Sequence, residues 1–203
     1  MDTTAADAGR LPMTWTRQLA PLSDGLVILR ELSLKDAGSL HTYLDNPEVR
    51  RHMAPPPGSI EGLQRFARWT QAQRREGALA CFAVMPIGVF HPVGLVQVWR
   101  VTPDFSTAEW GIVLGEPWWG RGVGRAAARL LIAFAFDTLN VQRLESRLAS
   151  ANERGRRLMT RLGATCQGVD DNQELWALQA SERDSARFAT PSRTAANGRF
   201  LDR

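Results

Sequence analysis

The segment from residue 79 to residue 136 most constrains the fold, because its hydrophobic period changes part-way along. Residues 79–85, 93–101 and 107–114 are short apolar runs separated by turn residues, which predicts three successive strands. The glycine-rich stretch WWGRGVGR at 118–125 then leads into a long helix with an apolar stripe. Strands joined by such short connections pair antiparallel, so we expect an antiparallel sheet to precede this helix in the chain.

Further elements flank this segment on both sides. They are a strand at 26–32, helices at 33–45 and 59–76, a strand at 143–148, a helix at 152–162 and then one or two final strands, one of them at 174–178. The first helix begins with a capping-box sequence at Ser33, and the stretch RRHMAPPPGS before the second is predicted to be a loop. The strand–helix–strand unit late in the chain implies a parallel pair. The predicted fold class is therefore α/β, a mixed sheet with helices on its faces.

The length of 203 residues suits one domain and is short for two. We expect this domain at 25–180, after a flexible N-terminal lead-in at 1–24 and before a polar tail at 181–203. The N-terminus lacks a signal-peptide core, and no run approaches the ~18 apolar residues of a membrane span. A cytoplasmic protein is expected.

The positive charge is almost entirely arginine. The formal net charge is +4, the pI is about 10.0 and Lys35 is the only lysine. Arginine suits planar contact with phosphate, so the composition indicates either a polyanionic ligand or a compositional bias with arginine on solvated faces. Nucleic acid is the weaker candidate ligand, since no helix-turn-helix, zinc-finger or RNA-recognition motif is present.

Metal and disulfide chemistry are not expected. Cys81 and Cys166 are too isolated for a disulfide framework, and His41, His52 and His91 lack the spacing of metal ligands.

Three alternating glycines, Gly120, Gly122 and Gly124, lie between a predicted strand and a predicted helix. Glycine lets backbone N–H groups approach a ligand, and the helix directs its positive dipole end to the same place. With Arg121 and Arg125 alongside, the stretch predicts a pyrophosphate cradle. Two alternatives are a turn without a ligand and a dinucleotide-binding loop. The second is disfavoured because the loop comes late and too little chain follows it.

These residues resemble the GNAT superfamily of N-acetyltransferases. The stretch at 119–124 resembles its acyl-CoA signature, with Trp119 where Arg or Gln is usual. That tryptophan, the Ala-Glu-Trp-Gly at 108–111 and the Asn-initiated helix ending in Leu162-Gly163 resemble the RimJ/RimL branch. The likeness covers roughly residues 25–179.

The resemblance implies a sheet in which two parallel strands, at 108–114 and 143–148, splay apart to admit the pantetheine arm. It implies acetyl-CoA as co-substrate and an amine as the partner. The residues themselves predict no metal and no membrane association, and a homodimer is left open. The implied cofactor-binding residues are Ile112, Val113, Leu114, Trp119, Gly120, Arg121, Gly122, Val123, Gly124, Arg125 and Asn152.

Glu109 is the candidate general base, because it interrupts an otherwise apolar strand and partial burial would raise its pKa. Related acetyltransferases carry a glutamate there that acts through water. The alternative is a solvated residue or an arginine partner. The usual acids are missing, since the only tyrosine is Tyr43 and the branch's serine position holds Gly155. A covalent route through either cysteine is disfavoured, because buried cysteines are more often inert.

The acceptor site is expected near the loop at 50–58 and the second helix. Candidate lining residues are Met53, Trp69, Phe82, Trp99 and Trp110, although aromatics at such spacing are more often core. Candidates for holding an ammonium group are Glu61, Glu76, Asp45 and Glu48. Direct acetyl transfer to a peptide N-terminus or a small amine is the favoured function. A non-catalytic acyl-CoA-binding module and a nucleic-acid-binding protein are the alternatives.

Overall fold

The computed structural model describes residues 14–51 and 57–182. Its eight strands form one sheet, in the order β1-β2-β3-β4-β5-β6-β8-β7. The strands are β1 (Leu22–Ser23), β2 (Val27–Glu31), β3 (Leu79–Pro86), β4 (Gly94–Arg100), β5 (Thr107–Leu114), β6 (Arg143–Ala149), β7 (Thr165–Asp170) and β8 (Gln173–Gln179). Neighbouring strands are antiparallel except for β5 and β6, which are parallel. The predicted mixed sheet is confirmed.

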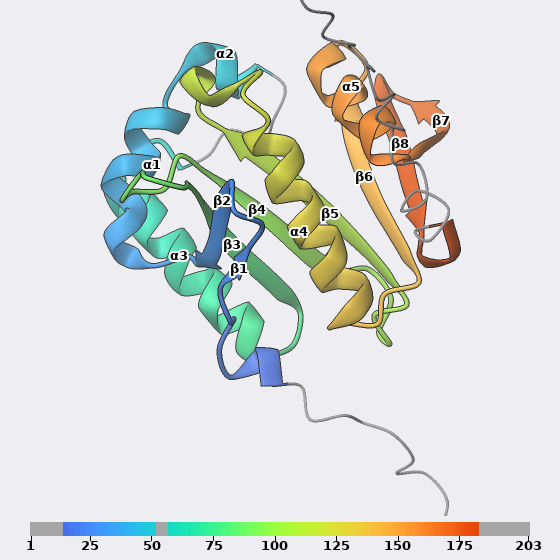
Figure 1. Cartoon of the computed structure of the whole chain (residues 1–203), viewed down its shortest axis with the longest axis horizontal. Coiled ribbons are helices and arrows are strands. Elements are labelled where there is room, and N and C mark those ends of the chain that lie inside the picture. The colour runs from blue at the N-terminus through green and yellow to red at the C-terminus, as the bar shows by residue number, and fades with distance from the viewer. Residues whose placement is uncertain (1–13, 52–56, 183–203) are drawn as a thin grey trace, which may run out of the picture.

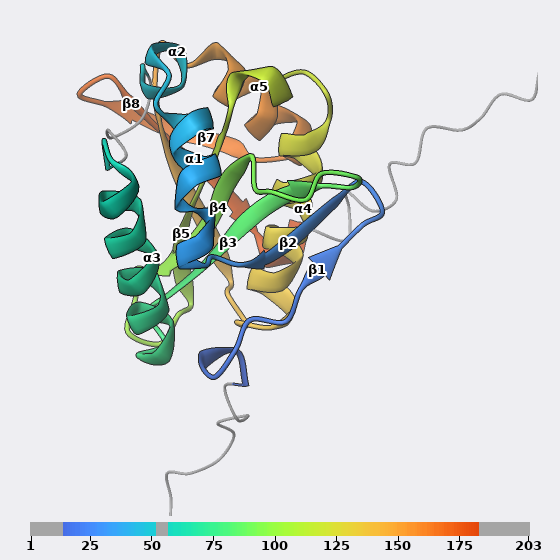
Figure 2. The same cartoon turned by 90° about the vertical axis from the view of Figure 1, so that its left-hand side faces the viewer.

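Helices cover both faces of the sheet (Figures 1 and 2). They are α1 (Ala37–Leu44), α2 (Pro47–Arg50), α3 (Ile60–Arg75), α4 (Val123–Asp137) and α5 (Glu153–Leu162). One hydrophobic core contains the inner faces of α1 and α3, and a second, larger one contains the inner face of α4 together with Met159 of α5. The sheet thus separates an α1/α3 side from an α4/α5 side. In the described ranges no helix is long and apolar enough to cross a membrane.

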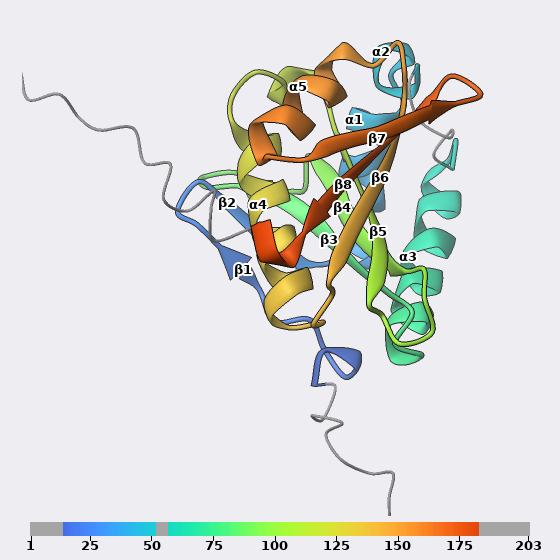
Figure 3. The ribbon, with the colours of Figure 1, turned by 90° about the vertical axis from the view of Figure 1, so that its right-hand side faces the viewer.

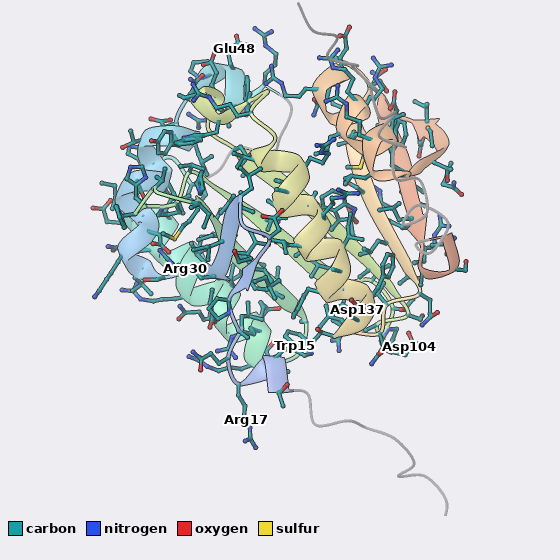
Figure 4. The ribbon with its side chains drawn as sticks, in the orientation of Figure 1. Trp15, Arg17, Arg30, Glu48, Asp104 and Asp137 are labelled. Atoms are coloured by element: carbon teal, nitrogen blue, oxygen red, sulfur yellow. The ribbon has the colours of Figure 1, made fainter. Side chains whose placement is uncertain are left out.

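The parallel pair β5–β6 opens into a fork. Its registered pairs are Thr107 with Arg143, Ala108 with Leu144, and Glu109 with Glu145, after which the two strands separate. Figure 1 shows them diverging toward the end of the molecule where α4 begins. Figure 4 places Glu48 of α2 at that open end, and Asp104 at the opposite end, where β5 starts. The expected splayed pair is therefore present.

The glycine-rich stretch leads from the open end of the fork into α4. Gly122 is the residue before the helix and adopts φ +83°, and Gly120 adopts φ +72°. Left-handed backbone of this kind is costly for residues with a Cβ, which explains glycine at both positions.

Three segments differ from the sequence-based expectations. Asn46-Pro47 ends α1 as predicted, but Asn46 also caps the short α2, because its Oδ1 accepts a hydrogen bond from Glu48 N at 2.8 Å. An additional edge strand, β7, pairs with β8, and every one of its residues is exposed (Figure 3). Packing also begins before residue 25, because Trp15 and Leu19 are buried in the larger core. Residues 183–203 of the tail predicted at 181–203, and residues 1–13 of the lead-in predicted at 1–24, lie outside the described residues.

Candidate active site

A cleft of about 870 Å³ passes through the sheet at the fork. On the α1/α3 side its lining includes Leu63 and Phe66 of α3, and on the α4/α5 side Leu158 and Met159 of α5. The strands contribute residues from both arms of the fork, including Glu109 and Ile112 from β5. A ligand in this cleft is therefore accessible to groups from both faces of the sheet.

Glu109 lies at the vertex of the fork, where the last registered pair places it beside Glu145. Its side chain is 15% exposed and accepts a hydrogen bond from Nη1 of Arg147. Burial raises the pKa of Glu109 above its ordinary value of 4.5, and the nearby charge of Glu145 adds to this, while Arg147 opposes it. A carboxylate with a raised pKa at the base of a cleft suits proton transfer near neutral pH. Glu109 is therefore mostly buried, as predicted for a base, and it also pairs with an arginine, as the alternative predicted.

The backbone of β5 faces the cleft in alternation. Gly115 N donates to Val93 O at 2.9 Å, so odd-numbered residues in this antiparallel ladder direct their N–H and C=O groups toward β4. Even-numbered residues direct theirs toward β6, and Ile112 lies beyond the last registered pair. Of the three backbone positions expected to bind a pantetheine arm, Ile112 faces the gap, whereas the groups of Val113 point to β4. The Leu114 carbonyl accepts from Trp119 Nε1 at 2.8 Å.

The start of α4 lies beyond this lining, at the open end of the fork. Gly120, Arg121, Gly122 and Arg125 are exposed there, while the Val123 side chain is buried in the core. Val123 can therefore contribute its backbone N–H but not its side chain. Gly122 offers no side chain to cap the helix, so the first N–H groups of α4 remain available to an anion.

The ring of Trp119 stacks with an arginine from a distant part of the chain. The Arg154 guanidinium carbon lies 3.5 Å from the centre of the Trp119 ring, close enough for a cation–π contact. Arg154 belongs to the first turn of α5, so this contact brings a positive charge from α5 beside the glycine-rich stretch. No local sequence pattern predicts this pair, because the two residues belong to different elements.

Asn152 caps α5 and also lines the cleft. Its Oδ1 accepts from Gly155 N at 2.9 Å, and both residues contribute to the lining. The predicted helix cap is present, and the contact with the cofactor arm stays a prediction that this cleft-lining position allows.

Only some of the residues predicted to form the acceptor site line the cleft. Trp99 and Trp110 line the cleft, but Trp69 is 48% exposed and Phe82 is buried in the core. Met53 lies outside the described residues. The four acidic candidates, Asp45, Glu48, Glu61 and Glu76, are absent from the described lining.

Comparison with known proteins agrees with this geometry. The model of the acetyltransferase (GNAT) domain family matches residues 27–165, which is more than half of the chain. The chain belongs to the GNAT family of N-acetyltransferases. It is 25% identical over 142 residues to the uncharacterized N-acetyltransferase p20 of Bacillus licheniformis, a match covering 70% of this chain and 80% of that protein.

Solved GNAT structures share the fold at low identity. Mycobacterium smegmatis RimJ in complex with CoA-disulfide superposes with a TM-score of 0.68 at 18% identity, over 80% of this chain and 87% of that one. The microcin C7 self-immunity acetyltransferase MccE, in complex with acetyl-CoA and AMP, gives 0.68 at 18% identity, over 77% and 93%. The fold assigned from the glycine-rich stretch and its flanking motifs is thereby confirmed.

Gly155, at the position where the RimJ/RimL branch often has a serine, is closely packed in this GNAT protein. A Cβ at Gly155 would lie 2.9 Å from Asn152 Nδ2 and 3.1 Å from Leu148 Cδ1. Both distances are shorter than ordinary contacts, so the folded-back Asn152 side chain occupies the space that a side chain at 155 needs.

We therefore expect Gly155→Ser to displace the Asn152 cap and to lower the free energy of unfolding by about 1–2 kcal/mol. Chemical denaturation measures this loss. The double variant Asn152→Ala/Gly155→Ser is the control, because it removes the clashing amide, so adding Gly155→Ser to Asn152→Ala should cost less than adding it to the wild type. Equal costs in the two backgrounds would contradict the steric explanation.

Proposed function

We propose that this protein binds acetyl-CoA and transfers its acetyl group directly to a primary amine. The observation that carries the proposal is the position of Glu109, a mostly buried carboxylate at the vertex of a cleft that reaches both faces of the sheet. An amine is mostly protonated at neutral pH and must lose a proton to attack a thioester. Glu109, directly or through a water molecule, would accept that proton.

The cofactor would lie along the open arm of β5. Its diphosphate would accept hydrogen bonds from the first N–H groups of α4, which also carry the positive end of the helix dipole. Ile112 would pair with the pantetheine arm through its backbone, as a neighbouring strand does. Relatives solved with CoA-disulfide and with acetyl-CoA support this class of ligand.

Direct transfer is favoured over an acyl-cysteine intermediate. Cys81 is buried, and burial raises the pKa of its thiol well above the ordinary value of 9.0. Cys166 is exposed on β7, and neither cysteine belongs to the described lining of the cleft. A backbone N–H at the cleft would then stabilise the tetrahedral oxyanion.

The charges that line the cleft limit which classes of amine it can accept as substrate. The described lining holds one carboxylate, Glu109, and two arginines, Arg51 and Arg147. A polyamine would bring several positive charges to a site with no surplus of negative charge, which disfavours binding. A single amine on an apolar or anionic body, as in a peptide N-terminus or an amino acid derivative, fits better.

Two measurements on the purified protein test the proposal. Calorimetry with acetyl-CoA should show binding, and a free-thiol assay with N-terminal peptides and small amines should then show turnover with at least one acceptor class. Binding without turnover on any amine would instead support an acyl-CoA-binding module, a reading favoured by the glycine at position 155. Absence of binding would refute both.

The stacked pair of Trp119 and Arg154 should contribute to cofactor affinity. We expect Trp119→Ala and Arg154→Ala each to raise the Kd for acetyl-CoA about tenfold, because each removes or releases a cation beside the diphosphate. Arg157→Ala is the matched control, since Arg157 is an exposed arginine of the same helix that pairs with Glu153 at 3.2 Å. Equal losses in all three variants would indicate general electrostatic attraction instead of a defined contact.

A further inference from the structure

Ser146 provides a side-chain hydroxyl that the proposed reaction has not yet used. Among the described residues lining the cleft, it is the one with a hydroxyl group. Ser146 is 3% exposed as a whole residue, and no hydrogen bond of its hydroxyl occurs among the described residues. Its oxygen is not one of the described side-chain atoms that are both fully buried and unpartnered, which leaves it open to the cleft that it lines. A hydroxyl without a protein partner, at the wall of a ligand-sized cleft, is available to a bound molecule.

Ser146 lies at the vertex of the fork, immediately after the last registered pair of β5 and β6. Side chains two residues apart share a face of a strand, so Ser146 lies on the same face as Leu144 and Leu148. Leu144 belongs to the core under α4, and Leu148 lies against Gly155 of α5. Ser146 is therefore on the α4/α5 side of the sheet.

Glu109 lies on the other face. It is registered with Trp99 of β4, and Trp99 packs against the core under α1 and α3. The vertex of the fork thus has a carboxylate on the α1/α3 side and a hydroxyl on the α4/α5 side. A thioester held between them would meet a proton acceptor on one side and a hydrogen-bond donor on the other.

The path of the cofactor brings the thioester to this vertex. A diphosphate at the start of α4 lies at the open end of the fork, near Leu114, the last residue of β5. From Leu114 back to Glu109 the strand spans five residues, which is ~17 Å at about 3.3 Å per residue. An extended pantetheine arm that runs along β5 from the diphosphate carries its sulfur toward the vertex.

We propose that Ser146 donates a hydrogen bond to the sulfur of CoA as the thiolate departs. This inference rests on the proposed acetyltransferase function. The amine nitrogen forms the bond to the acetyl carbon, its proton passes to Glu109, and the C–S bond breaks with its electron pair moving to sulfur. Ser146 retains its proton because an alcohol is a weaker acid than a thiol, and the thiolate later takes a proton from water. Hydrogen bonds to charged acceptors are stronger than those between neutral groups, so Ser146 stabilises the departing sulfur more than the bound thioester.

The test compares Ser146→Ala with Ser146→Thr and Ser150→Ala, using acetyl-CoA and an amine that the wild-type protein acetylates. We expect Ser146→Ala to lower kcat about ten- to a hundredfold while the calorimetric Kd for acetyl-CoA stays within about twofold. Ser146→Thr retains the hydroxyl and should recover most of kcat. Ser150→Ala removes a nearby serine hydroxyl outside the described lining and should match the wild type.

The outcomes separate this inference from the proposed function. Wild-type protein that releases no thiol with any amine would refute the function itself. Wild-type turnover with an unchanged kcat in Ser146→Ala would leave the function standing and overturn the role of Ser146. A parallel loss of acetyl-CoA binding in Ser146→Ala would also overturn it, because the side chain would then act in binding or packing.

Discussion

Replacing Glu109 with glutamine is expected to lower kcat at least about a hundredfold, with little change in the Kd for acetyl-CoA. The amide cannot accept a proton from the amine, while its similar size preserves the packing at the vertex of the fork. Steady-state kinetics with the free-thiol assay, together with calorimetry on the same preparation, measures the two quantities separately.

The pH dependence of the activity provides a second test of Glu109 as the base. Activity of the wild type should fall as the pH falls through the pKa of Glu109, which lies above 4.5, because the protonated acid is no longer a base. The glutamine variant should lack this acidic limb.

Glu145→Gln is the matched control, since Glu145 lies beside Glu109 in register and pairs with Arg143 at 2.7 Å. Removing its negative charge lets Glu109 ionise more readily, so the acidic limb should move to lower pH while kcat at neutral pH stays near the wild-type value. A Glu109→Gln variant with wild-type kcat would rule out the base and point to a binding module.

Replacing Gly122 with valine is expected to raise the Kd for acetyl-CoA at least about a hundredfold. Gly122 has φ +83°, a conformation that a β-branched residue adopts only with strain, so the backbone at the start of α4 should rearrange. The N–H groups that converge on the diphosphate would then no longer point to one place. Calorimetry with acetyl-CoA and with CoA measures the effect independently of the acceptor.

Gly163→Val controls for the strain itself. Gly163 has φ +82° at the end of α5, and no other group lies within 4 Å of the position its Cβ would take. Both variants should lose similar stability in chemical denaturation, but Gly163→Val should retain acetyl-CoA binding. If Gly122→Val binds as tightly as the wild type, the diphosphate lies elsewhere.

Local sequence patterns predicted the central part of the fold well. The three apolar runs became β3, β4 and β5, and the glycine-rich stretch begins α4 as expected. One or two final strands were expected, but local patterns give no residue range for β7, because all of its residues are exposed and it has no apolar alternation to detect. The short α2 is hard to predict because Asn46-Pro47 also marks the end of α1, although proline is common in the first turn of a helix.

The candidate site could be predicted one residue at a time but not as an arrangement. Glu109 stood out because it interrupts an apolar strand. Its contact with Arg147 depends on where β5 and β6 separate, and the stacking of Arg154 on Trp119 depends on how α5 packs against the start of α4. Ser146 likewise gains significance only from the register of the parallel pair. Such relations join residues that are distant in sequence, so no local pattern contains them.

The short β5–β6 ladder joins two parts of the protein. Strands β6, β8 and β7 with α5 join the rest of the sheet through three registered pairs, with α5 packed against α4. A ligand that bonds to both arms of the fork would tie these two parts together and add its binding free energy to the stability of the folded state. The opening proposed to admit a substrate thus coincides with a ladder of only three registered pairs, where a bound ligand can supply contacts that the two strands do not make with each other.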